Sequence, residues 1–503
     1  APDWNLSRDR FWATAMPVWK SESGKTRVIG SYAELKELSG MELEDYHRPW
    51  VDEITFEIDG EKYTRIDKVL DCWFESGSMP FAQFHYPFEN KEKFEKNFPG
   101  DFIVEYIGQV RAWFYYVHAV NTALFGKNAF KNVITTGVVA GNDGRKMSKS
   151  LGNGIDPLEV IDKYGADALR MMLITGNAPG NDMRFYYERV ESARNFANKI
   201  WNAAKFVIMN LEKYDPDFVP ADADLTLSDR WILASYNNLV RTVTKRLDAY
   251  ELGDAAACVY DFSWNCFCDW YIETAKGRLY GAHNADRQVT QYVLVYVLTR
   301  IMALLHPFMP FITEHLWQHL PHSGETLARA PWPAADERLR FPEEREQMER
   351  IMDAIKAVRN MRAEANVAPN RMCHIRIVVH RDDLKKCIET HEEYFEKLGH
   401  VEKIVLLAAD GTKPENALAA VVTGMEVYLE LKGLIDTAKE RERIEKAKAA
   451  LEKEIARTSG KLNNKGFLAK APENVVMKEK EKLMEFEEKM KSFDERLRFL
   501  ADL

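Results

Sequence analysis

The sequence V-I-T-T-G-V-V at residues 133–139, followed by G-R-K-M-S-K-S-L-G-N at residues 144–153, decides the expected fold of the N-terminal region. The first run is rich in β-branched residues and is flanked by Asn132 and Gly141, which predicts a buried parallel strand. An apolar and aromatic stretch of helical length, residues 103–125, precedes it. This order is typical of an α/β sheet, with the second run on a loop after the strand.

The loop carries two lysines, Lys146 and Lys149, on either side of Ser148 and between glycines. A mobile cationic loop of this kind suits a reaction that releases pyrophosphate, because negative charge then builds on the leaving group. A fixed cation aimed at that charge is worth about 3–4 kcal/mol, by analogy with the loss of one oxyanion-hole donor. The alternative is a solvated Lys/Ser turn, which the complete K-M-S-K-S string after an α/β unit disfavours.

Residues 171–335 change character, because strand-like runs give way to long helical patterns. The patterns that are long enough for bundle helices are residues 190–211, 227–250, 254–280 and 287–305. The following stretch begins with a helical segment at residues 343–365 and contains strand-like runs at residues 373–380 and 427–431. This combination predicts a small α/β module.

For two groups of residues, the expected role depends on whether their side chains are buried. The aromatic residues Trp264, Phe267, Trp270 and Tyr271 lie at helical spacing, which favours a bundle core over stacking on RNA bases. Glu105 lies in an otherwise apolar segment, where a buried carboxylate needs a partner, so a binding role is favoured.

The C-terminal residues predict a coiled-coil hairpin. On the first arm, Leu451, Ile455, Thr458 and Leu462 step by 4, 3 and 4, and on the second, apolar residues from Leu483 to Leu500 step by alternating 3 and 4. This is the 3.5-residue period of a supercoiled seam. A basic cluster without an intervening acid surrounds the turn and suits phosphate contacts, although it could also serve only to solvate the turn. Its members are Arg457, Lys461, Lys465 and Lys470.

The composition excludes several classes of protein. The chain has 503 residues, 46% hydrophobic and 29% charged, as expected of a soluble protein with several domains. We find neither a signal-peptide pattern nor an apolar stretch long enough to cross a membrane, and the first residue, Ala1, indicates a processed or excised start. The six cysteines include no C-x-x-C pair, so we expect reduced thiols, a cytoplasmic location and no metal site. With a net charge of −9, any RNA-binding surface must be locally basic.

The K-M-S-K-S string at residues 146–150 is identical to the second signature of class I aminoacyl-tRNA synthetases. Residues 155–170 resemble the valyl, isoleucyl and leucyl branch of this family. Later segments that resemble the valyl branch are residues 262–273, 306–314, 359–364, 433–436 and 467–472. Earlier segments that look isoleucyl-like are residues 3–12, 71–80 and 86–91. The resemblance covers essentially the whole chain, and a natural hybrid or a deliberate chimera would each account for the switch.

The resemblance implies a multidomain α/β plus all-α protein. Its expected parts are the C-terminal half of a Rossmann-type catalytic domain (1–170), a helical junction (171–225), an anticodon-binding helical bundle (226–335), a small α/β module (336–432) and a coiled-coil tRNA-binding arm (433–503). It also implies ATP-dependent ligation of valine to its tRNA by a monomer, through an aminoacyl adenylate, with Mg²⁺ accompanying ATP. The implied site residues are Lys146, Ser148 and Lys149 for the departing phosphates, Glu105 and Gln109 for the adenylate, and Trp73 and Gly137 for the pocket wall.

The chain departs from the family pattern in several places. The H-I-G-H signature and the editing domain, which normally precede the segment that begins here, are absent, so a missing N-terminal half is an expected partner. The adenylate-contacting stretch, usually E-G-x-D-Q-T-R-G-W-F, reads E-Y-I-G-Q-V-R-A-W-F at residues 105–114, where Gly108 replaces Asp and Ala112 replaces Gly. Ala13 and Ala15 stand where the family usually has Gly and Pro. These departures predict that this chain alone does not form the adenylate.

Two alternative functions remain open. One is an isoleucine–tRNA ligase, since one methylene is worth only about 1–3 kcal/mol in a binding pocket. The other is a non-catalytic, tRNA-binding module that resembles a synthetase. An upstream H-I-G-H half in the gene would argue against the module, and a charging assay with both amino acids and both tRNAs would distinguish the two ligases.

Overall fold

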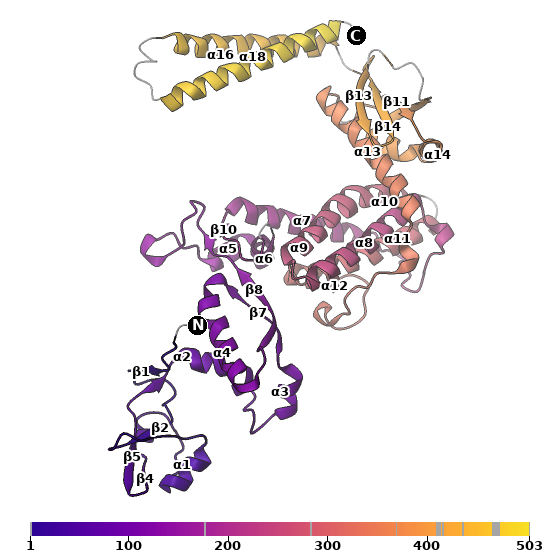
Figure 1. Cartoon of the computed structure of the whole chain (residues 1–503). Coiled ribbons are helices and arrows are strands. Elements are labelled where there is room, and N and C mark those ends of the chain that lie inside the picture. The colour runs from indigo at the N-terminus through magenta and orange to yellow at the C-terminus, as the bar shows by residue number, and fades with distance from the viewer. Residues whose placement is uncertain are drawn as a thin grey trace. The chain divides into compact units, whose positions relative to one another are not determined.

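The computed structural model describes residues 3–175, 178–281, 284–368, 370–408, 414, 417–434, 437–464 and 473–501 (Figure 1). The chain forms two compact units. The first unit comprises Ala1–Gly165, Met171–Ser192 and Arg246–Asp254, and the second comprises Ala166–Arg170, Ala193–Lys245 and Ala255–Leu503.

An antiparallel sheet of order β3-β2-β5-β4 begins the first unit. Its strands are β2 (Val18–Ser21), β3 (Thr26–Val28), β4 (Thr55–Ile58) and β5 (Glu61–Arg65). Helix α1 (Tyr32–Ser39) ends at Gly40 in the left-handed conformation that glycine favours. Trp19, Ile54 and Phe56 form the core of this part. These strands could not be predicted from the sequence, because each is too short to show a clear alternation.

A parallel pair of strands follows in the first unit. The elements of this part are β1 (Ser7–Arg8), paired with β6 (Val69–Leu70), then α2 (Cys72–Ala82), α3 (Lys91–Asn97), β7 (Gly100–Tyr106), η2 (Ile107–Arg111), α4 (Trp113–Phe125), β8 (Phe130–Thr136), β9 (Val139–Ala140), η3 (Lys149–Leu151), α5 (Pro157–Tyr164) and β10 (Met183–Arg184). Strands β7 and β8 are parallel, and so are β9 and β10. The predicted helical stretch 103–125 therefore divides into β7, η2 and α4, because its first residues pair with a strand about thirty residues later in the chain.

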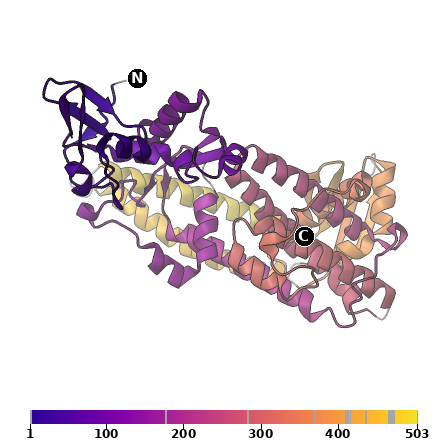
Figure 2. The ribbon, with the colours of Figure 1, turned by 90° about the horizontal axis from the view of Figure 1, so that it is seen from below.

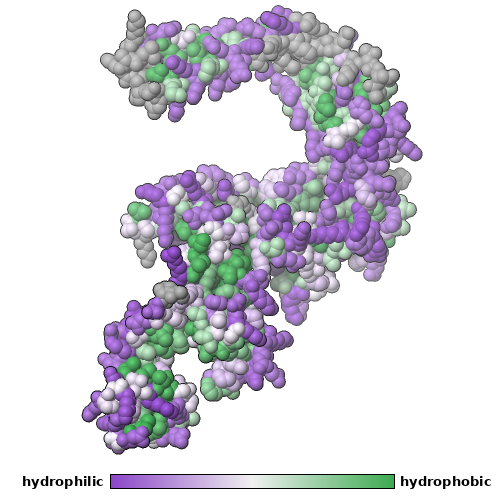
Figure 3. Space-filling model, in the orientation of Figure 1, coloured by the Kyte–Doolittle hydropathy of each residue, from purple (hydrophilic) through white to green (hydrophobic). Residues whose placement is uncertain are grey.

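The prediction of a parallel strand is correct, but the prediction that it is buried is wrong. Val133 in β8 is 50% exposed. In β7, the alternate residues Phe102, Val104 and Tyr106 share one face and are 53%, 43% and 39% exposed. Figure 3 shows hydrophobic residues gathered in this region of the first unit. Parallel sheets are normally covered on both faces, so this face has the character of an interface.

The second unit contains the predicted helical bundle. Its helices are α6 (Ala166–Ile174), α7 (Tyr187–Met209), α8 (Leu227–Asp248), α9 (Leu252–Asp261), η5 (Phe262–Tyr271), α10 (Ile272–Leu279), α11 (Asn284–Leu305) and α12 (Pro310–Trp317). Of these helices, residues 171–174, 187–192, 246–248 and 252–254 belong to the first unit. The predicted single helix 254–280 is interrupted by η5, a π-helix. Phe267, Trp270 and Tyr271 are buried, which confirms the core interpretation for these three aromatic side chains.

One helix of the bundle is long and apolar enough to cross a membrane, judged by its length and composition alone. Ala285–Leu305 has a mean hydropathy of 1.4, so the expectation that no such stretch exists was wrong. However, 67% of this window is buried inside the structure. A core helix passes the same test, so the finding is weak evidence for a membrane location.

Helices and a four-stranded sheet follow in the second unit, with more elements than the sequence indicated. They are α13 (Pro342–Glu364), β11 (Cys373–Val379), α14 (Asp382–Thr390), α15 (Glu392–Gly399), β12 (Val401–Leu407), β13 (Ala417–Val422) and β14 (Met425–Glu430). The sheet order is β12-β11-β14-β13, with β11 parallel to β12 and antiparallel to β14.

Two long helices, α16 (Thr437–Asn463) and α18 (Glu473–Ala501), end the chain and lie side by side (Figures 1 and 2). Ion pairs join Lys448 to Asp494 at 2.5 Å and Lys461 to Glu479 at 3.0 Å. Lys448 precedes Lys461 on α16, whereas its partner Asp494 follows Glu479 on α18, so the two helices are antiparallel.

Candidate functional site

The K-M-S-K-S loop leaves strand β9 and is held by its own backbone and by Asn153. The Gly141 N–H donates to the carbonyl of Arg145 at 3.0 Å. The side chain of Asn153 accepts from the Ser148 N–H at 2.9 Å and donates to the Lys146 carbonyl at 3.4 Å. Asn153 therefore bridges the two ends of the signature, a positioning role that the sequence analysis did not assign.

The loop presents positive charge to solvent. The side chain of Lys146 is exposed, and Ser148 is half-buried with its hydroxyl 3.1 Å from that of Ser150. Arg145 pairs with Asp143 at 2.6 Å, and hydrogen bonds from Arg145 lower the pKa of that carboxyl. The side chain of Lys149 lies outside the described part of the structure. Among the described side chains of the loop, Lys146 is exposed and has no ion pair, so it can bind an anion directly.

Two close approaches explain glycines beside the loop. A Cβ on Gly137 would lie 1.9 Å from the carbonyl oxygen of Asn181, so only glycine fits there. Gly144 has a φ of 79°, and the guanidinium of Arg184 lies about 3.1 Å from its Cβ position. Gly137 thus acts first as a packing residue, and Arg184 brings to the loop a further cation that the sequence analysis missed.

The two expected adenylate contacts lie at the carboxyl end of β7, next to the end of β8. Glu105 is exposed rather than buried, which corrects the sequence interpretation, and its Oε1 accepts from the Tyr106 N–H at 3.0 Å. Gln109 uses its side-chain oxygen to accept from the Trp113 N–H at the start of α4. In a parallel sheet, loops that follow the carboxyl ends of strands form the ligand site, and Glu105 and Gly137 share that end.

Two departures from the family pattern, Gly108 and Ala112, lie near this strand end. A Cβ on Gly108 would lie 2.2 Å from the hydroxyl of Tyr106. The phenol ring at position 106 therefore occupies the space that a side chain at position 108 would need. Ala112 adopts φ −133° and ψ −107°, an unusual conformation at a position where the family pattern has glycine.

Trp73 belongs to an aromatic cluster in the first unit. Its ring stacks on that of Tyr116 with centroids 5.5 Å apart, and Trp4 lies 4.4 Å from the same ring. The indole N–H of Trp4 donates to Asp71 at 2.8 Å. This cluster ties the N-terminal segment to α2 and α4, so the structure supplies a packing role for Trp73.

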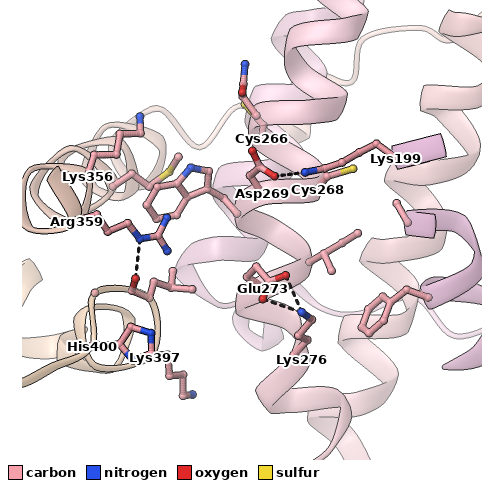
Figure 4. Close-up of a pocket in the computed structure, with 18 of the residues that line it drawn as sticks. Lys199, Cys266, Cys268, Asp269, Glu273, Lys276, Lys356, Arg359, Lys397 and His400 are labelled. Atoms are coloured by element: carbon pink, nitrogen blue, oxygen red, sulfur yellow. Dashed lines mark hydrogen bonds and ion pairs between the residues drawn. The ribbon is translucent and has the colours of Figure 1, made fainter. Parts of the chain in front are cut away.

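A cavity of about 1200 Å³ lies within the second unit, among α7, η5, α10, α13 and α15 (Figure 4). Cationic side chains line it in excess over carboxylates. The cations are Lys199, Lys276, Lys356, Arg359, Arg362 and Lys397, and the carboxylates are Asp269 and Glu273. Burial raises the pKa of Cys266 to about 11 and that of Cys268 to about 12, so the two thiols in the wall remain neutral.

The carboxylates of the cavity are already paired. Asp269 forms an ion pair with Lys199, and Glu273 pairs with Lys276 at 2.7 Å. The cations on α13 and α15 therefore decide the charge of the remaining surface. This arrangement favours an anionic ligand, since each wall carboxylate is neutralised by its own lysine.

The floor of the cavity combines an aromatic face with cations. Arg359 lies over the ring of Trp270 at 4.9 Å and Lys356 at 5.8 Å. Arg359 also donates to the carbonyl of Leu398 at 2.8 Å, and burial lowers the pKa of its guanidinium. Trp270 lies in the π-helix η5, a conformation found frequently at functional sites. Because Trp270 itself is buried, its ring supports the two cations, and the cations are the groups that face a ligand.

The sequence contained a signal for this cavity. Lys356, Arg359 and Arg362 are spaced by three residues on α13, which places them along one side of the helix. The signal was missed because the partner residues on η5 lie almost a hundred positions earlier in the chain.

The basic cluster of the tail is only partly described. Arg457 pairs with Glu454 at 3.6 Å and Lys461 with Glu479 of the other helix at 3.0 Å. Lys465 and Lys470 lie outside the described residues. The sequence showed no acid between these cations, but the opposite helix supplies one.

Comparison with known proteins gives three consecutive matches. Residues 1–186 match the family of tRNA synthetases class I (I, L, M and V), residues 229–377 match the anticodon-binding domain of tRNA ligase, and residues 436–501 match the valyl tRNA synthetase tRNA binding arm.

Similar whole proteins agree with these matches. The valine–tRNA ligase of Clostridium acetobutylicum is 43% identical over 95% of this chain and 52% of its own length. That of Carboxydothermus hydrogenoformans is 41% identical over 99% of this chain and 54% of its own length. The chain thus spans about half the length of the curated relatives it matches. Among solved structures, the LeuRS–tRNA–LeuAMS ternary complex of Agrobacterium radiobacter shares the fold, with a TM-score of 0.52 and 18% identity over 80% of this chain and 50% of that chain.

Proposed function

We propose that the chain is part of a class I aminoacyl-tRNA synthetase of the valyl type and serves in the ATP-dependent ligation of valine to tRNA. One observation carries the proposal: valine–tRNA ligases match 95% and 99% of the chain, on both sides of the K-M-S-K-S loop. The match to the valyl tRNA-binding arm at residues 436–501 favours valine over isoleucine.

The proposed activity requires more than the residues of this chain. Because the chain spans about half the length of its relatives, the remaining part must be supplied by the same or a second polypeptide. The exposed apolar face formed by Phe102, Val104 and Tyr106 supports this requirement, since burying such a face stabilises an association by roughly 25 cal/mol per Å². The proposal therefore treats residues 1–170 as one half of a Rossmann-type catalytic domain.

In this proposal the K-M-S-K-S loop binds the phosphates of ATP, which is a substrate of the reaction. The exposed Lys146, together with Ser148 and Lys149, would meet the negative charge that builds on pyrophosphate as it departs. Mg²⁺ would accompany the ATP, as it does for polyphosphate substrates generally. Glu105 and Gln109 would contact the adenylate only after giving up their present bonds to Tyr106 and Trp113.

The second unit would bind the tRNA. We assign the cavity lined by Lys356 and Arg359 to the anticodon loop, because these cations can contact its phosphates, while the buried ring of Trp270 supports Arg359 from the protein side. The antiparallel pair α16 and α18, with the heptad-like spacing of a coiled coil, would brace the body of the tRNA through Arg457, Lys461, Lys465 and Lys470. The domain boundaries given above, a monomeric state and a cytoplasmic location belong to the same proposal.

A charging assay on the complete gene product tests the proposal. Purified protein is incubated with ATP and with labelled valine or isoleucine, each with either cognate tRNA. We expect charging of tRNA-Val with valine, at a kcat/KM at least tenfold above that of any other combination. Preferential charging of tRNA-Ile with isoleucine would show that the protein is an isoleucine–tRNA ligase. Charging of neither tRNA by the complete product would favour the non-catalytic, tRNA-binding module.

The loop residues have a separate test. In the complete protein, Lys149→Ala should slow adenylate formation by about 100-fold, with a smaller change in the KM for valine, because the lysine meets charge that develops in the transition state. ATP–pyrophosphate exchange measures both parameters. A change confined to the KM for valine would show that the lysine does not stabilise the transition state.

A further inference from the structure

Three residues of the first unit form a row across neighbouring strands at the start of the K-M-S-K-S loop. Ala140 of β9 pairs with Lys146 in an antiparallel bridge on one side and with Arg184 of β10 in parallel register on the other. Directly paired residues of neighbouring strands have their side chains on the same face of a sheet. Lys146 and Arg184 therefore share one face of this row, on either side of the small side chain of Ala140.

The side chain of Arg184 extends to the turn that precedes Lys146. Two hydrogen bonds close this turn, from the Gly144 N–H to the Gly141 carbonyl at 2.9 Å and from the Gly141 N–H to the Arg145 carbonyl at 3.0 Å. The guanidinium carbon and Nη2 of Arg184 lie 3.1 Å from the place that a Cβ of Gly144 would occupy. The glycine therefore leaves room for the guanidinium directly beside the loop.

Both cations of the row can bind an anion without first losing an ion pair. Lys146 and Arg184 are exposed, and their side chains form no ion pair or hydrogen bond with any residue that the structure describes. The carboxylate within the turn, that of Asp143, is already paired with Arg145 at 2.6 Å. The face thus carries two positive charges that no described carboxylate neutralises.

The spacing of the two cations indicates the kind of anion that fits. Neighbouring strands lie about 4.8 Å apart, so the backbones of Lys146 and Arg184, two strands apart, are separated by roughly 10 Å. A condensed phosphate offers each side chain a phosphoryl group of its own across this span. A planar guanidinium binds two oxygens of one phosphate at once, whereas the ammonium group of a lysine acts as a point charge.

We propose that Arg184 is a further phosphate-binding residue of this face, and that Arg184 and Lys146 together bind two adjacent phosphoryl groups of a condensed phosphate. The binding of a diphosphate follows from residues of the first unit alone. The identification of this diphosphate as the part of ATP that leaves as pyrophosphate rests on the proposed function.

Calorimetric titration of the full chain with inorganic pyrophosphate, at low salt and without metal ions, tests the site in the absence of any ligation reaction. Arg184→Gln should weaken pyrophosphate binding about tenfold, the scale of one charge-assisted contact, and should weaken binding of inorganic phosphate less. Arg184→Lys should recover part of the loss, because it keeps the charge but not the planar fork. Failure of the native chain to bind pyrophosphate would overturn the proposal.

Arg189 provides a matched control in the first unit. It is an exposed arginine of α7 that lies over the ring of Tyr186, 5.5 Å from the ring centroid. Arg189→Gln removes the same charge outside the row and should change pyrophosphate affinity by less than about twofold, because exposed charges away from the site are screened by salt. Equal weakening by the two glutamine variants would overturn the site. A lower melting temperature of Arg184→Gln with unchanged affinity would show that the arginine only packs on the turn.

ATP–pyrophosphate exchange by the complete gene product tests the identity of the diphosphate. Arg184→Gln should raise the KM for pyrophosphate about tenfold, with a smaller change in the KM for valine, since the lost contact is to a phosphate. Unchanged exchange kinetics in this variant would overturn the assignment to ATP and leave the proposed function intact. Absence of exchange in the native product would count against the proposed function, and the calorimetric titration would still decide the site.

Discussion

The cavity of the second unit gives the sharpest prediction, because its charges can be counted. Removing the two cations over Trp270, with Lys356→Gln and Arg359→Gln, should weaken binding of an anticodon hairpin RNA. Lys199 and Lys276 are already paired with the wall carboxylates, whereas Lys356 has only a longer pair at 3.6 Å with Asp353 of its own helix, so we expect the α13 cations to make two of the main phosphate contacts.

The size of the effect follows from counterion release. Each lost phosphate contact lowers the slope of log affinity against log salt by about 0.7 for single strands and about 0.9 for duplexes, so two contacts lower it by roughly 1.4–1.8. Between about 50 and 200 mM salt, the native chain should therefore lose roughly tenfold more affinity than the variant. Arg359 also packs on Trp270, so the melting temperature of the variant should be recorded beside its affinity.

Fluorescence anisotropy of a labelled hairpin, at four or more salt concentrations, measures this slope. The matched control is Lys385→Gln with Lys386→Gln, which removes two exposed charges of α14 outside the cavity. We expect the control to keep nearly the native slope. An unchanged slope in the cavity variant, or the same reduction in the control, would refute the assignment of the cavity to RNA phosphates.

Three further predictions follow from single features. Ala13 has a φ of 129°, so Ala13→Gly should raise the free energy of unfolding by about 1 kcal/mol in urea titrations, and no gain would show that the backbone there is unstrained. Hydrogen bonds from Arg338 lower the pKa of Asp336 from 3.8 to about 2. Its contribution to stability is therefore present above about pH 4 and lost as the pH falls towards 2, and Asp336→Asn should flatten this acid limb in pH-dependent denaturation. Arg457→Gln with Lys461→Gln should reduce the salt slope for full-length tRNA by less than the cavity variant does, because Lys461 is already paired at 3.0 Å with Glu479 of the other helix; an equal or larger reduction would contradict this.

Local patterns allowed much of the architecture to be predicted from the sequence. Long helices such as α8 and α11 repeat apolar residues over many turns, and this signal does not depend on distant partners. The paired helices at the end of the chain follow from the same kind of periodicity. The K-M-S-K-S loop is recognisable because its chemistry lies in five consecutive residues.

Other features depend on residues that meet only when the chain folds. The exposure of Glu105 and the ring of Tyr106 over Gly108 could not be predicted, because an apolar strand segment has the same sequence whether or not its face is covered. The short strands β2 to β5 exist because they pair with each other, and no single strand is long enough to show its alternation.

The sequence by itself indicated the family resemblance, the order of the parts and the position of the cationic loop, since these are written in contiguous residues. Tertiary structure alone decided the cavity and the contact between α6 and α12. Trp270 meets Arg359 from a helix almost ninety residues away, and Asp167 meets Ile312 across 145 positions. Such contacts depend on how helices pack and on how their free backbone groups are satisfied, and neither is encoded in the spacing of residues along one segment.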